Sequence, residues 1–240
     1  MKNMTRRSFV STAASGAAVL SALAGLAPQA DAQLVWKTGD WKLNEFQSLV
    51  KHPAPIKQLF DVTQIGNGKF LDNMKNSLNG LHFGFGVPLS NIKLVGGLHG
   101  PANLLNYDDF IWEKYRIGAW LNVNDPDTGK PALRNPFYLR PSSLPPIVPS
   151  QNPNDPTSQY QDSSMRALQS RGVQFLSCHT ALEEQVRALI KHSHLTQEPE
   201  PIVREMLAHT VPGVLVVASM VAAVALLQCE GHYSYISIAS

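Results

Sequence analysis

GVQFLSCHTALEEQVRALI, residues 172–190, changes from a strand pattern to a helix pattern within a few positions. Residues 172–177 form a short, mostly apolar run, which is typical of a buried strand. Residues 181–190 carry apolar side chains at the three- and four-residue spacing of an amphipathic helix. A buried strand followed directly by such a helix is the building unit of α/β proteins.

The same unit occurs at other places along the chain. Strands are expected at 56–62, 92–98, 172–177 and 214–217, each followed by a helix, at 68–78, 104–115, 181–190 and 220–227, and a last strand is expected at 233–238. A shorter helix is expected at 202–208. This alternation predicts a mainly parallel sheet that is covered by helices on both faces.

Two regions fall outside this alternation. Residues 117–160 are rich in Asn, Asp, Pro, Gly and Ser, so we expect a long Pro-rich insertion in the domain. An insertion of this length is either a surface excursion without a role or a lid or binding surface, and both readings stay open. The apolar run 211–227 contains Pro212 and Gly213, so we expect no stable membrane span there.

The first 32 residues have the pattern of a removable twin-arginine signal peptide. Arg6 and Arg7 precede an Ala-rich apolar run, and Ala30-Asp31-Ala32 resembles a cleavage site. A membrane anchor is the alternative, but the run is poorer in strongly apolar residues than a span of about 20 residues requires. We therefore expect export to the periplasm and a mature single domain at 33–240.

The charge of the mature chain limits its partners. Removal of residues 1–32 takes three of 20 Lys and Arg and one of 18 Asp and Glu, which leaves 17 of each sign. A neutral chain without a basic stripe lacks the electrostatic footprint of a nucleic-acid-binding protein. We expect no nucleic-acid partner.

The candidate site follows from the expected sheet, because ligands of parallel α/β sheets bind outside the carboxyl ends of the strands. The side chains just beyond these ends are expected to converge on one rim. Cys178 and His99 are the candidate catalytic residues of the rim, and its candidate binding residues are Asp61, Thr63, Gly100, His179, Thr180 and Ser219.

Cys178 is expected at the start of a helix, with Thr180 as N-cap and Glu183 at capping-box spacing. Helix-terminal N–H groups lower the pKa of a thiol, so Cys178 is either a reactive nucleophile or a packed strand residue. His99 either assists a thiolate or bound anion or forms structural hydrogen bonds in its turn. The second cysteine, Cys229, is expected at the far end of another helix, buried and not disulfide-bonded to Cys178.

Other common chemistries find little support. No phosphate-binding glycine loop and no nucleophile elbow follows any expected strand. A copper or zinc site at Cys178, His179 and His99 is a weaker alternative, because the spacing of metal-binding motifs does not occur. The sequence assigns no cofactor.

Four motifs resemble those of the DsrE-like proteins, particularly the exported members. They are GGLHGP at 96–101, RGVQFLSC at 171–178, VPGV at 211–214 and LQCEGHYSYI at 227–236. The resemblance implies a three-layer α/β/α sandwich with a mainly parallel, flavodoxin-like five-stranded sheet and a homo-oligomer. In the sulfur-relay members one cysteine carries persulfide, and Cys178 matches its neighbourhood. The insertion is unlike the compact relay subunits, and the turn 179–181 differs from the Asn-Thr-like turn that often follows the cysteine in exported members.

Three functions follow as hypotheses. The chain is a periplasmic thiol- or sulfur-handling protein, in which Cys178 is the carrier, His99 assists and the partner is a sulfur donor or acceptor, either a protein or a small molecule. Alternatively, it is a non-catalytic small-ligand or protein-binding module. A third hypothesis is a metal-binding protein that is loaded before export.

Overall fold

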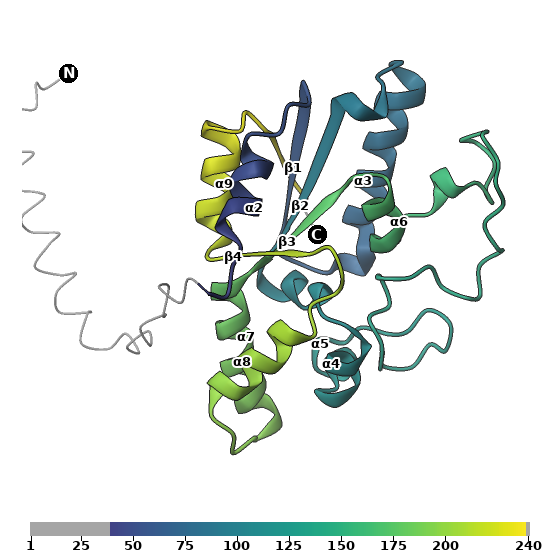
Figure 1. Ribbon diagram of the computed structural model, residues 1–240. Coiled ribbons are helices and arrows are strands. Elements are labelled where there is room, and N and C mark those ends of the chain that lie inside the picture. The colour runs from purple at the N-terminus through teal and green to yellow at the C-terminus, as the bar shows by residue number, and fades with distance from the viewer. Residues whose placement is uncertain (1–38, 239–240) are drawn as a thin grey trace, which may run out of the picture. The chain divides into compact units, whose positions relative to one another are not determined.

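Five parallel strands form the central sheet in the computed structural model, which describes residues 39–238. The expected signal peptide, residues 1–32, lies outside the described residues. The order across the sheet is β4-β3-β2-β1-β5 (Figure 1). The strands are β1 (Ile56–Val62), β2 (Ile92–Leu98), β3 (Gln174–Cys178), β4 (Leu215–Val217) and β5 (Ser234–Ser237). All five lie where the sequence predicts them, and β1 and β2 have the predicted bounds.

Helices cover both faces of the sheet, so the predicted three-layer, flavodoxin-like arrangement is confirmed (Figure 1). The larger hydrophobic core, on one side of the sheet, includes residues of α3 (Lys69–Asn79), α4 (Asp109–Lys114), α5 (Ile117–Leu121), α6 (Met165–Ser170), α7 (His179–Ser193) and α8 (Pro199–Ala208). The other face carries α2 (Leu43–Val50) and α9 (Met220–Cys229).

The handedness of the connections explains this division. From β1 to β4 each connection moves in the same direction across the sheet, and right-handed crossovers in one direction lie on one face. The connection from β4 to β5 runs back to the opposite edge, so its helix, α9, lies on the other face. In such sheets the ligand-binding crevice lies between two neighbouring strands that are followed by helices on opposite faces. In this sheet those strands are β3 and β4.

Strands β1 to β4 are largely buried, whereas the edge strand β5 is mostly exposed, and the buried side chains alternate between two cores. In β1, Phe60 belongs to the larger core under α3 and α7, whereas Leu59 belongs to the smaller core under α2 and α9. In β3, Phe175 and Leu176 divide in the same way. This alternation with a period of two decides on which face each residue of the rim lies.

The predicted helix at 104–115 is divided in the structure. Residues 100–106 form a 3₁₀ helix, and α4 begins only after Asp108, whose side chain accepts a hydrogen bond from the Ile111 N–H at 3.3 Å. An aspartate at this position caps a new helix and interrupts the preceding one. The predicted helix at 202–208 is confirmed as the longer α8, and α2 and α6 were not predicted.

The insertion at 117–160 is more than a surface loop. It begins with α5, and Ala132 is fully buried in the larger core. The Asn135 side-chain amide donates to the carbonyls of Leu105 at 2.7 Å and Tyr107 at 3.0 Å. The first half of the insertion is therefore anchored in the domain, and residues 142–157 make up its mostly exposed outer part.

Cys229 is exposed, which corrects the prediction that it is buried. Helix α9 buries only Met220, Ala223 and Leu227, so the last turn of an almost wholly apolar helix still faces outward. Both cysteines are free, and the predicted absence of a disulfide between them is confirmed. None of the helices between residues 39 and 238 is long and apolar enough to cross a bilayer.

Candidate functional site

The structure gathers the predicted rim residues at the carboxyl ends of the strands. Asp61 lies near the end of β1, His99 directly follows β2, Cys178 ends β3, and Ser219 follows β4. Because Leu59 and Leu176 point toward α2 and α9, the alternation places Asp61 and Cys178 on that same face. The backbone of His99 is extended, so its side chain also lies on the face of the sheet covered by α2 and α9.

His99 is hydrogen-bonded to Asp61 rather than to the thiol. The distance from His99 Nε2 to Asp61 Oδ1 is 2.8 Å, and the Tyr235 hydroxyl donates to Asp61 Oδ2 at 2.6 Å. We call Asp61, His99 and Tyr235 the rim cluster. Its members come from β1, the end of β2 and β5, and all three remain partly exposed.

The hydrogen bonds of the rim cluster set its protonation. The hydrogen bond from His99 lowers the pKa of Asp61, with a smaller contribution from the Tyr235 hydroxyl, against the opposing effect of burial. An ionised carboxylate only accepts hydrogen bonds, so in the neutral imidazole the proton lies on Nε2. His99 Nδ1 forms no hydrogen bond with residues 39–238.

Cys178 lies at the meeting point of two helix N-termini. Its Sγ accepts hydrogen bonds from the N–H groups of Ala181 in α7 at 3.4 Å and of Met220 in α9 at 3.2 Å. The side chain is 4% exposed, and burial raises the pKa of the thiol, although the backbone N–H groups act in the opposite direction. The position at a helix start is confirmed, and the raised pKa agrees with the reading of Cys178 as a packed strand residue, because desolvation outweighs the helix ends.

Thr180 is not the N-cap of α7. Cys178 itself is the N-cap, through its sulfur, and Thr180 Oγ1 donates to the carbonyl of Ala218 at 2.9 Å. The expected capping box with Glu183 therefore does not form, and Thr180 instead joins the first turn of α7 to the end of β4. Ser219 is the N-cap residue of α9 but accepts no capping hydrogen bond through its side chain.

Met220 lies between the two predicted catalytic groups. Its N–H donates to Cys178, and its sulfur would lie 2.9 Å from a Cβ placed on Gly97, two residues before His99. Glycine at 97 therefore lets the Met220 side chain pack directly on the strand. The structure gives the thiol and the imidazole separate partners, and no hydrogen bond joins them.

The remaining predicted residues shape the backbone of the rim. Gly100 has φ +53, and a Cβ there would lie 2.9 Å from the carbonyl oxygen of Thr63. That carbonyl accepts a hydrogen bond from the Ala102 N–H at 3.3 Å, so the two turns after β1 and β2 are tied together. A side chain at position 100 would be disfavoured by both its φ and this close approach.

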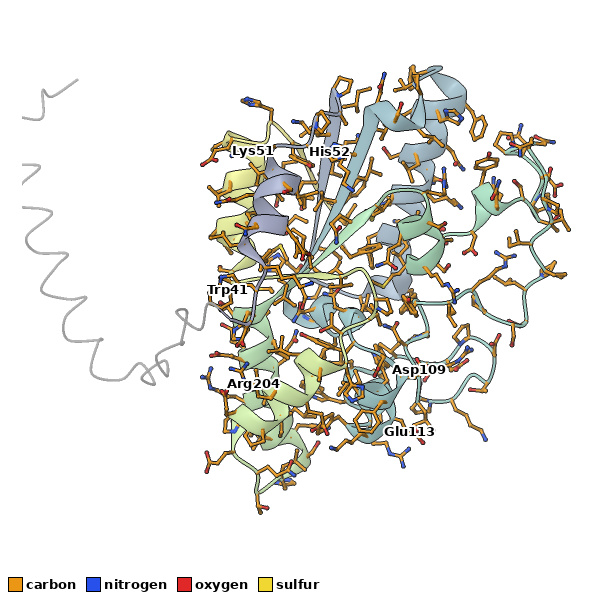
Figure 2. All side chains as sticks on the ribbon, viewed as in Figure 1. Trp41, Lys51, His52, Asp109, Glu113 and Arg204 are labelled. Carbon is orange, nitrogen blue, oxygen red and sulfur yellow. The ribbon has the colours of Figure 1, made fainter. Side chains whose placement is uncertain are left out.

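His179 is buried and points away from the rim cluster. Its Nε2 lies 2.8 Å from Asp40 Oδ2, and the Trp41 ring packs against it edge to face at 5.6 Å. Asp40 also forms an ion pair with Arg204 of α8. Figure 2 labels Arg204 on α8 and Trp41 just before α2. These contacts fasten the segment before α2 to α7 and α8, which is a structural role.

A small apolar pocket opens beside β4. It has a volume of about 110 Å³ and is lined by residues of α2 and α9 and by the end of β4, among them Trp41, Phe46, Ser219 and Leu226. Pockets for drug-sized ligands and cofactors measure about 300–1,000 Å³. This pocket is therefore suited to a small group and not to an organic cofactor.

The described part of the chain contains no group of three or more His, Cys, Asp or Glu side chains placed to hold a metal ion. The weaker prediction of a site at Cys178, His179 and His99 therefore has no geometric support there. Each of the three side chains has a different partner. Cys178 accepts from helix-terminal N–H groups, His179 is hydrogen-bonded to Asp40, and His99 is hydrogen-bonded to Asp61.

Sequence reasoning missed two residues that organise the rim. Tyr235 completes the rim cluster, and the alternation of residues 233–236 is the signal that places it on the side of Asp61. Asn103 is fully buried, and its side chain accepts from the Cys178 N–H at 2.9 Å and donates to the Cys178 carbonyl at 3.2 Å. No local pattern predicts this contact, because the two residues are 75 positions apart.

Comparison with protein-family models, with curated proteins and with solved structures finds no match to this chain.

Proposed function

We propose that this chain is a non-catalytic binding module, of the DsrE-like type, which is exported to the periplasm and binds a small ligand at the rim cluster. The observation that carries the proposal is the difference in availability between the two candidate groups. His99 is partly exposed and its Nδ1 has no partner among residues 39–238, whereas the Cys178 thiol is buried and accepts from two backbone amides.

The chemistry of the rim cluster indicates the ligand class. Asp61 presents carboxylate acceptors beside the unpaired Nδ1 of His99, and an additional acceptor on the ligand would find the Tyr235 hydroxyl already donating to Asp61. A ligand with hydroxyl or amine groups supplies the donors that the rim needs. Sugars, polyols and primary amines are therefore the first candidates.

A thermal-shift screen of these three compound classes tests the proposal. We expect at least one compound to raise the melting temperature with concentration, as mass action requires of a ligand that binds the folded state. H99A should abolish the shift, and H52A should preserve it, because His52 bonds to the Ala54 N–H outside the rim. The proposal fails if no compound stabilises the wild type or if the shift survives in H99A.

A sulfur carrier at Cys178 is a second candidate, which is favoured by the two helix N-termini that direct N–H groups at its sulfur. Such groups stabilise an anionic sulfur. In that case the thiolate attacks a polysulfide, a new S–S bond forms at Cys178, and a polysulfide shorter by one sulfur leaves.

Intact-mass analysis of C229A after treatment with polysulfide tests this second candidate. A carrier gains the mass of one sulfur atom in C229A and gains none when C178A is added. No gain in C229A under native conditions excludes Cys178 as a carrier.

A further inference from the structure

Arg171 has a half-buried guanidinium without a carboxylate partner, at the amino end of β3 and so at the opposite end of the sheet from the rim. Its Nη2 donates to Asn79 Oδ1 at 2.7 Å, but its buried Nε and Nη1 meet no acceptor among the described residues. The Tyr160 ring lies 5.5 Å from the guanidinium carbon. A buried cation of this kind is costly unless an acceptor or an anion compensates it.

A hollow of about 410 Å³ is lined in part by Arg171. Its wall combines an apolar side, made of Leu89, Ile147 and the Tyr160 ring, with the polar side chains of Gln159 and Arg171. The Phe83 ring packs edge to face on Tyr160 at 4.8 Å and supports that ring. This volume lies within the range of pockets that hold small organic molecules, about 300–1,000 Å³.

The surroundings of the hollow are positively charged. An adjacent hollow shares Asp162, Ala167 and Ser170 with it and adds Arg140 and Arg166 to its wall. Arg140 also has a buried Nε without an acceptor. Within residues 39–238 the arginines that form ion pairs are Arg134, Arg187 and Arg204.

One carboxylate opposes these charges. Asp162 lines both hollows, and its Oδ1 accepts a hydrogen bond from the Ser164 N–H at 2.8 Å, just before α6. Three guanidinium groups therefore surround a single carboxylate, which leaves a net positive potential over the two hollows.

We propose that the hollow beside Arg171 binds a small organic carboxylate, with its head group at the guanidinium and its apolar body between Leu89 and Ile147. A planar guanidinium matches a carboxylate in geometry as well as in charge. The apolar wall is what separates this ligand class from an inorganic oxyanion, for which Leu89, Ile147 and Tyr160 would serve no purpose. The site is independent of the rim cluster.

Calorimetric titration with hexanoate tests the proposal, with 1-hexanol and sulfate as comparison compounds at matched ionic strength. We expect saturable binding of hexanoate and at least tenfold weaker binding of the other two compounds. R171M should weaken hexanoate binding at least tenfold, whereas R116M, which removes an exposed arginine outside the hollow, should leave it unchanged. Equal binding of hexanol or sulfate, or unchanged binding in R171M, overturns the proposal.

A second variant keeps the test valid if R171M fails to fold. I147E retains Arg171 and places a carboxylate on the apolar wall. Because this carboxylate would pair with the Arg171 guanidinium in place of the ligand, the variant should not bind hexanoate and should have a melting temperature at or above that of the wild type. Hexanoate binding to I147E with wild-type affinity overturns the proposal.

Discussion

Replacement of Cys178 by alanine tests whether its sulfur has a structural role. The side chain is 4% exposed, and truncation removes about one methylene equivalent of buried volume, which costs about 1 kcal/mol. Truncation also leaves the N–H groups of Ala181 and Met220 without their acceptor, at about 1 kcal/mol or more each. We therefore expect C178A to lower the free energy of unfolding by about 2–4 kcal/mol.

Urea denaturation of C178A, C178S and C229A measures this loss, with the slope of the transition checked for constancy. C229A serves as the matched control, because Cys229 is exposed and its replacement should change stability by no more than about 0.5 kcal/mol. C178S keeps an acceptor for both amides and should lie between wild type and C178A. The reasoning is refuted if C178A and C229A are equally stable, or if C178S is less stable than C178A.

Two further predictions concern the rim and the insertion. D61N should reduce the acid sensitivity of folding. The pKa of Asp61 is lower in the folded state than in the unfolded chain, so the carboxylate stabilises the fold fully above about pH 4. This stabilisation is lost as the pH falls from the pKa of the unfolded chain through the lower pKa of the folded state. Unfolding free energies of D61N and wild type at pH 3 and pH 7 check this, and an unchanged difference between the two pH values would contradict it. G118A should cost about 2–4 kcal/mol, because the new Cβ would lie 2.4 Å from the backbone of Ala132, whereas G80A meets no atom within 4 Å and should be nearly neutral or slightly stabilising. If the melting curves of G118A and G80A coincide, the insertion is not anchored at Gly118.

Strands β1 to β4 could be predicted because each is a largely apolar run between turn residues, and a strand covered on both faces needs such a run. Residues 56–62 and 92–98 show this best, since their predicted bounds agree with β1 and β2. The convergence of Asp61, His99 and Cys178 on one rim followed from the parallel direction alone. These predictions depend on local pattern and on general rules of topology.

The partners of the rim residues could not be predicted, because they depend on register and burial. Pairing of Asp61 with Gly97 places His99 within reach of the Asp61 carboxylate, and a single sequence does not specify that register. The thiol pKa could not be predicted for a related reason: the helix start was visible in the sequence, but the burial of Cys178 under α9 was not.

The exposure of Cys229 in α9 could not be predicted from the sequence either. Residues 220–227 are apolar on every side, so their pattern does not say which side meets the sheet. The structure turns Cys229 outward. In the insertion, the contacts of Asn135 with Leu105 and Tyr107 join distant segments, and no local spacing signals them.

The pH dependence of Cys178 alkylation tests the central claim, that the rim cluster and not the thiol is the available group of this site. The measurement follows the rate of iodoacetamide modification of native C229A by mass spectrometry. Burial raises the pKa of Cys178, so we expect slow modification at pH 7 and a midpoint above about 8.5, the value of an unperturbed thiol. Rapid modification at pH 7 with a midpoint below that value would contradict the account and favour the sulfur carrier.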